Sequence, residues 1–160
     1  MTTAIKIRFA TENDISLILQ FIRELAEYEK LLSEVMATEE ILRENLFGEK
    51  KHAEVIIAEL DQTAVGFALF FHNFSTFLGK PGVYLEDLYV QETARGFGVG
   101  KKMLQFLAKL ALDRKCGRLE WWVLDWNKTA IDFYKKLGAE PMSDWTVYRV
   151  AGDALKNLAG

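Results

Sequence analysis

The spacing of hydrophobic residues in the first part of the chain predicts one strand followed by two helices. In residues 5–9 apolar and basic side chains alternate, which is typical of a strand with one exposed face. Apolar residues then recur every three or four positions, so we predict a helix that begins after Thr11 and ends at about Tyr28. A connection follows, and a second helix is predicted between its N-cap Thr38 and Gly48.

The rest of the pattern alternates strands with helices. Residues 53–59 and 64–74 are apolar segments joined by a short polar sequence, which predicts a hairpin. Residues 79–82, Gly-Lys-Pro-Gly, have the composition of a loop. The remaining predicted elements are a strand at 84–90, a helix ending near Gly117, a strand at 118–124, a helix at 129–137, a strand at 146–150 and a terminal helical turn at 154–158. This order predicts an α/β fold in which a mixed sheet carries helices on both faces. The β-α-β crossover that contains the glycine-rich residues 96–100 is expected to be parallel and right-handed.

Composition narrows the class of protein. The chain has 160 residues, of which 50 % are hydrophobic, so we expect a single globular domain over residues 1–160. No apolar run approaches the roughly 20 residues of a membrane span, and we expect no membrane partner. One cysteine, Cys116, excludes an internal disulfide and fits a reducing, cytoplasmic location. His52 and His72 are isolated in the sequence, so no metal site is expected.

Charge is distributed unevenly around a net value of −3. Residues 24–49 contain eight carboxylates against two basic residues, and residues 95–136 contain ten Lys or Arg against four acidic residues. The first block would attract cations and the second anions, although each block can also be an ordinary solvated surface. The basic residues lack interleaved stacking aromatics, so we expect no nucleic-acid partner.

A glycine-rich segment carries the clearest chemical signal. Gly96, Gly98 and Gly100 stand at alternate positions between a predicted strand and a predicted helix, with Arg95 before them and Lys101 after them. Such a turn exposes backbone N–H groups at the positive end of a helix dipole, and the missing Cβ atoms allow a phosphate to approach. Taken alone, the same pattern also fits a tight turn without a ligand.

Two common phosphate-binding motifs do not fit this segment. A P-loop requires Gly-x-x-x-x-Gly-Lys-Ser/Thr, but Arg95 occupies the first glycine position and Lys102 the hydroxyl position. A dinucleotide fingerprint requires Gly-x-Gly-x-x-Gly, and here the third glycine comes one residue early. Neither motif therefore accounts for this segment.

Residues 95–100, Arg-Gly-Phe-Gly-Val-Gly, resemble the [QR]-x-x-G-x-[GA] pyrophosphate loop of the GNAT acetyltransferases. Asn127 and residues 133–139 resemble two further motifs of that superfamily, and residues 84–90 and 24–29 are similar to its diamine branch, the spermidine/spermine and thialysine acetyltransferases. The resemblance implies the acyl-CoA N-acyltransferase fold, with a mostly antiparallel sheet, and acetyl-CoA as cosubstrate. It also implies a homodimer.

The resemblance, together with the exposed N–H groups of the glycine turn, assigns the acetyl-CoA site. The strand segment would pair with the pantetheine arm, the glycine turn would bind the pyrophosphate, and a third segment would contact the donor further along the chain. These residues are Leu88, Tyr89, Val90, Arg95, Gly96, Phe97, Gly98, Val99, Gly100, Lys101, Asn127, Lys128, Thr129 and Ala130.

Acetyl transfer to an amine needs a base and an acid. Deprotonation of an alkylammonium to the neutral amine costs about 4 kcal/mol near pH 7.5. Glu86 is the first candidate for the base, directly or through water, and Asp87 is the second. Successive strand residues point to opposite faces, so we expect that the two do not share one role. Tyr134 keeps its proton at neutral pH and can protonate the leaving thiolate, and the resemblance implies the same role. Glu86 can equally be a solvated strand residue, and Tyr134 a packed helix residue.

The resemblance also implies an acceptor site for a small cationic amine, such as a polyamine, a diamine or thialysine. The implied substrate-binding residues are Tyr28, Glu29, Glu86, Asp87 and Asp144. Cys116 has no motif base beside it, so direct transfer without an acetyl-enzyme is expected. The alternatives are an acetyltransferase acting on protein amines and a non-catalytic CoA-binding module.

Overall fold

The chain divides into two compact units, one up to Trp122 and one from Val123 to Gly160. The first unit is built on a five-stranded sheet. The structure is a computed structural model, and it describes residues 3–160. The sheet has the order β1-β2-β3-β4-β5, with three antiparallel pairs and a parallel pair between β4 and β5. The strands are β1 (Ile5–Phe9), β2 (Glu54–Leu60), β3 (Thr63–Ser75), β4 (Lys80–Val90) and β5 (Leu119–Trp121). The predicted mixed, mostly antiparallel sheet is therefore confirmed.

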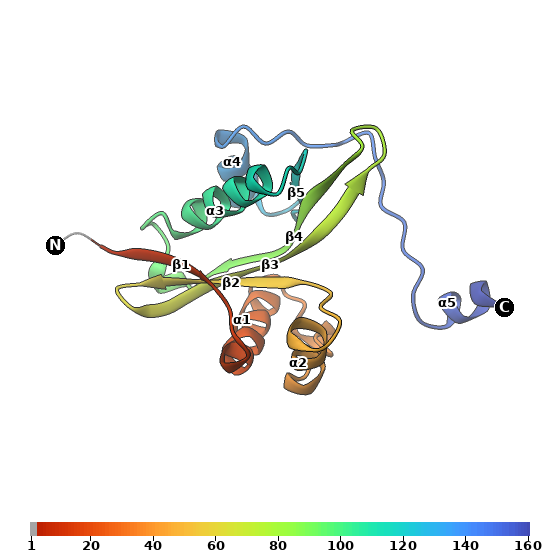
Figure 1. The fold of residues 1–160 in the computed structure, drawn as a ribbon, viewed down its shortest axis with the longest axis horizontal. Helices are drawn as coiled ribbons and strands as arrows, with labels where there is room; N and C mark the ends of the chain where they lie inside the picture. Colours follow the sequence, from red (N-terminus) through yellow and green to blue (C-terminus); the bar gives the residue numbers. More distant parts are fainter. Residues whose placement is uncertain (1–2) are drawn as a thin grey trace. The chain divides into compact units, whose positions relative to one another are not determined.

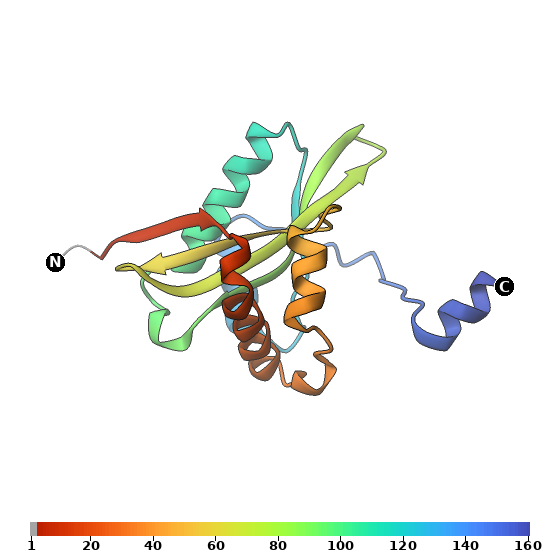
Figure 2. The same cartoon turned by 60° about the horizontal axis from the view of Figure 1, so that its bottom comes forward.

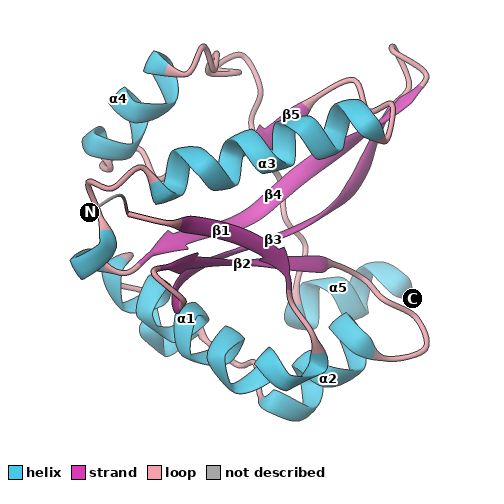
Figure 3. Cartoon of the chain, turned by 60° about the vertical axis from the view of Figure 1, so that its left-hand side comes forward, coloured by secondary structure: helices cyan, strands magenta, loops and turns pink. Residues whose placement is uncertain are grey.

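Helices cover both faces of this sheet, as predicted (Figures 1 and 2). Helices α1 (Ile15–Tyr28) and α2 (Glu39–Phe47) lie on one face, and α3 (Val99–Asp113) lies on the other (Figure 3). Three single 3-10 turns, η1 (Glu12–Asp14), η2 (Leu32–Glu34) and η3 (Glu92–Ala94), connect the main elements. Thr38 caps α2 as expected, because its Oγ1 accepts a hydrogen bond from the Ile41 N–H at 3.2 Å.

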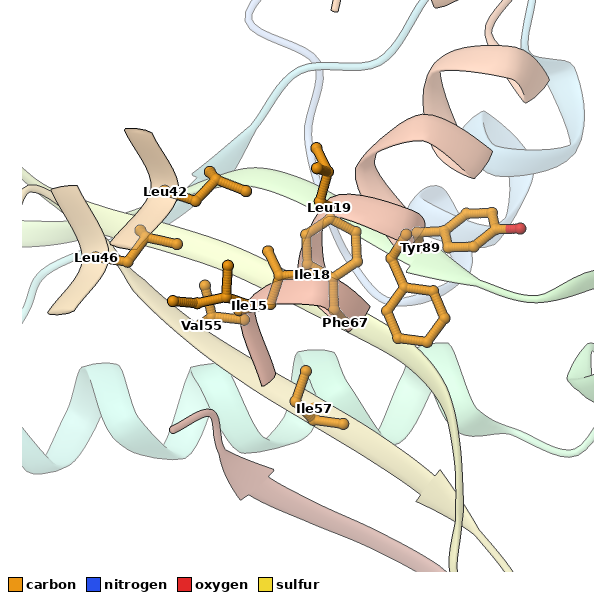
Figure 4. Packing of buried hydrophobic residues seen from close by; sticks show 10 residues of the cluster. Ile15, Ile18, Leu19, Leu42, Leu46, Val55, Ile57, Phe67 and Tyr89 are labelled. Atoms are coloured by element: carbon orange, nitrogen blue, oxygen red, sulfur yellow. The ribbon is translucent and has the colours of Figure 1, made fainter. Parts of the chain in front are cut away.

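The core between α1, α2 and the sheet is assembled from the hydrophobic faces that the sequence pattern identified (Figure 4). Phe21 of α1 is fully buried and stacks on Phe67 of β3 at a centroid distance of 5.8 Å. Phe21 also contacts Tyr89 of β4 at 6.0 Å. Burial of these rings packs the middle of α1 against the second half of β4, the half that carries Glu86 and Asp87.

The β2–β3 hairpin closes through a two-residue turn. Asp61 and Gln62 both have positive φ angles, 49° and 72°, so the backbone follows the twist of a type I′ turn. The predicted hairpin is confirmed.

The predicted loop over residues 79–82 is wrong, because β4 already begins at Lys80. Pro81 pairs with Phe74, and Gly82 pairs with Asn73. An ideal Cβ on Gly82 would collide with the Asn73 Oδ1, so the glycine leaves room for the Asn73 side chain. Gly-Lys-Pro-Gly has loop composition, but the long β3 supplies a partner that draws these residues into the sheet.

The second unit contains α4 (Lys128–Lys136) and α5 (Gly152–Ala159), and the latter extends the predicted terminal turn. The predicted strand at 146–150 is wrong, since these residues are exposed and pair with no described strand. Alternation of side chains is a local signal, whereas a strand forms only where another strand offers an edge. Strand β5 is also shorter than the predicted 118–124. Among the described residues, no helix has both the length and the apolar character needed to cross a bilayer.

Candidate acetyl-transfer site

A β-bulge in β4 places the two carboxylates at the centre of the candidate site. Asp87 pairs with Leu69, and Leu85 pairs with the next residue of β3, Phe70, so Glu86 is the extra residue. The bulge shifts the alternation of side chains along β4. Leu85 and Asp87 would share a face in a regular strand, but here they lie on opposite faces. The sequence argument that separated Glu86 from Asp87 assumed regular alternation, and that assumption is wrong here.

Asp87 lies on the face covered by α1 and α2, within electrostatic range of two other carboxylates. Asp87 is half-buried there, two residues before Tyr89, which packs on α1. Burial, and then the charges of Glu86 and Glu29, raise the pKa of Asp87 to about 7. Burial also raises the pKa of Glu29, at the end of α1. The structure therefore brings Glu29, Glu86 and Asp87 within electrostatic range, which produces a site that favours a cation.

We expect Asp87→Asn to stabilise the protein at pH 8 and to have little effect near pH 4. The folded pKa of about 7 lies above the ordinary value of 3.8, so the native state binds this proton more tightly. The free energy of unfolding therefore decreases as the pH rises from about 4 through 7. The expected decrease is roughly 1–3 kcal/mol, because solvent partly screens the Asp87 charge. Thermal unfolding from pH 4 to pH 9 measures the effect, with Asp113→Asn on α3 as the control. Parallel Tm–pH curves for wild type and Asp87→Asn would contradict the assignment.

The edge of β4 beyond the bulge is available for backbone pairing. Strand β5 pairs with β4 only at residues 83–85, so among the described strands none pairs with the outer edge from Glu86 to Val90. The segment predicted to pair with pantetheine, Leu88 to Val90, lies on this edge. The Tyr89 side chain faces the α1 core and its backbone groups are directed at β3, so the outward-facing backbone groups of this segment belong to Leu88 and Val90.

The glycine turn that follows has the geometry of an anion cradle. Gly96 and Gly98 have φ angles of 86° and 84°, a left-handed conformation that favours glycine, and Gly98 is the N-cap of α3. In the described chain, the backbone N–H groups from Gly96 to Lys101 donate to no backbone carbonyl; the first such bond joins the Lys102 N–H to the Gly98 oxygen at 3.0 Å. These donors lie at the positive end of the α3 dipole, as the sequence predicted.

The side chains of the turn differ in their surroundings. Val99 is buried and anchors α3, whereas Phe97 is 53 % exposed. Arg95 donates from Nε to the Val90 carbonyl at 3.1 Å, and its guanidinium carbon lies 4.9 Å from the centre of the Tyr28 ring. Arg95 thus connects the glycine turn with β4 and with the end of α1.

The remaining predicted site residues belong to the second unit. The Asn127 side chain accepts a hydrogen bond from the Ala130 N–H at 3.3 Å and so caps α4, the helix that includes Lys128, Thr129 and Ala130. Tyr134 lies in the same helix, with its ring 5.6 Å from that of Phe133. Asp144 is exposed and lies outside the helices. The roles given to these residues remain predictions.

Two sets of side-chain contacts beside the site were not predicted from the sequence. The Gln91 side chain donates to both carboxylate oxygens of Glu24 at 3.3 Å. Tyr89 also hydrogen-bonds to Glu24. Burial, and then the charge of Glu24 and this hydrogen bond, raise the pKa of Tyr89 to about 12. Tyr84, next to the bulge, contacts Phe71 at 5.0 Å and Trp122 at 5.9 Å. The run of aromatic residues in these strands was the available signal, but it could not specify which rings meet.

Comparison with known proteins assigns the family. The sequence matches the acetyltransferase (GNAT) family over residues 19–139. The chain therefore belongs to the GNAT family and is an N-acetyltransferase, and this family uses acetyl-CoA as its cosubstrate. The resemblance and the enzyme class inferred from the sequence are confirmed.

Relatives of known name are similar over nearly the whole chain. The chain is 42 % identical over 167 residues to thialysine N-epsilon-acetyltransferase of Bos taurus, covering 98 % of each chain. It is 31 % identical over 198 residues to L-ornithine N5-acetyltransferase NATA1 of Arabidopsis thaliana, covering 96 % of this chain and 87 % of the relative. The solved V. cholerae integron cassette protein VCH_CASS6 is 30 % identical, with a TM-score of 0.80 and 97 % of both chains covered.

Proposed function

We propose that this enzyme transfers an acetyl group from acetyl-CoA directly to the primary amine of a small cationic acceptor. The acceptor would be a diamine, a polyamine or an amino acid with a terminal amine, such as thialysine or ornithine. The observation that carries the proposal is the cluster of Glu29, Glu86 and Asp87 beside the unpaired edge of β4. The names of the relatives that cover nearly the whole chain support the same acceptor class.

The donor would be held mainly by backbone groups. N–H groups from Gly96 to Lys101 would bind the pyrophosphate, and the free edge of β4 from Leu88 to Val90 would pair with the pantetheine amides. In the second unit, residues 127–130 would add further donor contacts at the start of α4. Acetyl-CoA supplies the activated acetyl group as a thioester.

The acceptor would enter as an ammonium and react as a neutral amine. The three carboxylates stabilise the cation electrostatically, and Glu86 would accept the amine proton through water. Asp87 is the second candidate, because a pKa of about 7 suits proton transfer near neutral pH. A bound ammonium would favour the ionised form of Asp87, so acceptor binding and deprotonation of this group reinforce each other.

The thiolate would leave with a proton from the Tyr134 hydroxyl. The ordinary pKa of tyrosine, about 10, exceeds that of a thiol, about 8.5, so complete transfer of the proton to the thiolate is uphill by about 2 kcal/mol. Cys116 is half-buried at the end of α3 and has no base motif beside it, and we therefore propose a single displacement without an acetyl-enzyme.

The test is thiol release from acetyl-CoA with a panel of amines: spermidine, spermine, putrescine, thialysine, ornithine, lysine and a lysine peptide. We expect turnover with at least one small cationic amine and a higher kcat/KM for it than for the peptide. Glu86→Gln should lower that value at least tenfold, while Glu49→Gln, which removes an exposed carboxylate outside the cluster, serves as the control. Preference for the peptide would favour a protein acetyltransferase. If no amine is acetylated although acetyl-CoA binds, a non-catalytic CoA-binding module is favoured.

We further propose that the enzyme is a homodimer. Apolar side chains of the second unit are exposed, including Trp145 at 75 % and Tyr148 at 92 %. The segment 146–150 keeps the alternation of a strand but pairs with no described strand, and a second copy could provide that partner. Light scattering coupled to gel filtration measures the mass; a monomer at micromolar concentration would contradict the proposal.

A further inference from the structure

The Arg95 side chain joins three elements that the proposed reaction must keep together. Arg95 is the first residue of the glycine turn, its Nε donates to the carbonyl of Val90 at the end of β4, and its guanidinium covers the ring of Tyr28 at the end of α1. A guanidinium within about 6 Å of an aromatic centroid is attracted to the ring face. The motif alone would assign Arg95 to the pyrophosphate, but its side chain contacts β4 and α1.

The backbone forms a helix cap directly after Tyr28 and Glu29, at the end of α1. The chain leaves α1 through Lys30, whose φ of 62° is unusual for a residue other than glycine. The Leu31 N–H donates to the Ala26 carbonyl at 2.7 Å, which is the cap bond expected when a left-handed residue ends a helix. Tyr28 is 40 % exposed, so the surrounding protein covers this residue only in part. The guanidinium of Arg95 supplies a specific contact at this exposed helix end.

We propose that Arg95 is a positioning residue for the acceptor amine, not a phosphate ligand. By holding the Tyr28 ring, Arg95 orients the adjacent Tyr28–Glu29 pair toward Glu86 and Asp87 and connects it to the glycine turn. This inference rests on the proposed function, because Tyr28 and Glu29 contact the acceptor only if the reaction is acetyl transfer to a small amine. It predicts that loss of the guanidinium affects acceptor recognition more than donor binding.

The first measurement compares Arg95→Gln with the wild-type enzyme. We expect the KM for the acceptor to rise about fivefold, the range of a partly exposed cation–π contact, while the KM for acetyl-CoA and the Kd for CoA by calorimetry change less than twofold. Arg23→Gln removes a positive charge from the exposed surface of α1 and serves as the matched control. It should change neither constant more than twofold.

A double-mutant cycle identifies the contact itself. Tyr28→Leu removes the ring, so Arg95→Gln should have little additional effect in that background, whereas Tyr28→Phe keeps the ring and should leave most of the Arg95→Gln effect in place. Arg95→Lys retains a cation but loses the planar guanidinium and should recover only part of the acceptor affinity. Additive effects of Arg95→Gln and Tyr28→Leu would overturn the proposal.

Calorimetry with CoA separates this inference from the proposed function. If Arg95→Gln weakens CoA binding tenfold or more, Arg95 is a phosphate ligand and the inference fails, whatever the acceptor. If no amine of the panel reacts, the proposed function fails; the inference then fails as well, because it requires an acceptor. If amines react and only their KM values respond to Arg95→Gln, with the non-additive cycle described above, the inference is supported.

Discussion

Tyr134→Phe is expected to lower kcat at least tenfold while the affinity for acetyl-CoA changes little. The substitution removes one hydroxyl proton from α4 and keeps the ring, including its contact with Phe133. A general acid contributes about 10²–10⁴-fold to a proton-transfer step, and water can replace part of that contribution. Steady-state kinetics with the best amine of the panel, together with calorimetry for CoA, measures both quantities.

The matched control is Tyr148→Phe, which removes a hydroxyl from an exposed tyrosine of the same unit. It should leave kcat within twofold of the wild-type value. An unchanged kcat for Tyr134→Phe would mean that water or another group protonates the leaving thiolate. A loss of CoA affinity as large as the loss of kcat would mean that the Tyr134 hydroxyl binds the donor instead.

Gly98→Val is expected to weaken acetyl-CoA binding at least tenfold. An ideal Cβ on Gly98 meets no protein atom within 4 Å, so the substitution creates no clash within the chain. Its effect arises because valine disfavours the φ of 84° and because its side chain would occupy the space above the exposed N–H groups. Calorimetry with CoA and with acetyl-CoA measures the change.

Gly79→Val controls for backbone strain. Gly79 also has a positive φ, 65°, with no atom within 4 Å of an ideal Cβ, but it lies in the β3–β4 turn, outside the glycine cradle. We expect this variant to lose stability without losing CoA affinity. Wild-type CoA affinity for Gly98→Val would contradict the assignment of this turn to the pyrophosphate, and equal losses in both variants would indicate a general effect of strain.

The two parts of the proposed chemistry depend on different kinds of groups. Donor binding would rest on backbone N–H groups at the start of α3, which respond to changes of backbone conformation. Acceptor binding would rest on the side chains of Glu29, Glu86 and Asp87, which respond to changes of charge. Substitutions in the two regions should therefore separate into effects on acetyl-CoA affinity and effects on acceptor KM, and Arg95 lies between them.

The sequence by itself determined the features that depend on neighbouring residues. Helices α1 and α2 followed from the apolar spacing and the Thr38 cap, and the glycine turn followed from three alternate glycines between a strand and a helix. The family followed from the ordered motifs. These signals are readable because helix periodicity, capping and left-handed turns are set within a few residues of the chain.

Only the tertiary structure decided the features that depend on distant partners. The bulge at Glu86 arises from the register between β3 and β4, and the start of β4 at Lys80 arises because β3 offers an edge. The strand expected at 146–150 lacks such an edge among the described strands. The raised pKa of Asp87 comes from burial and from Glu29, a residue 58 positions away in the sequence. The Arg95–Tyr28 contact likewise requires α1 and the glycine turn to meet, and no local pattern encodes that meeting.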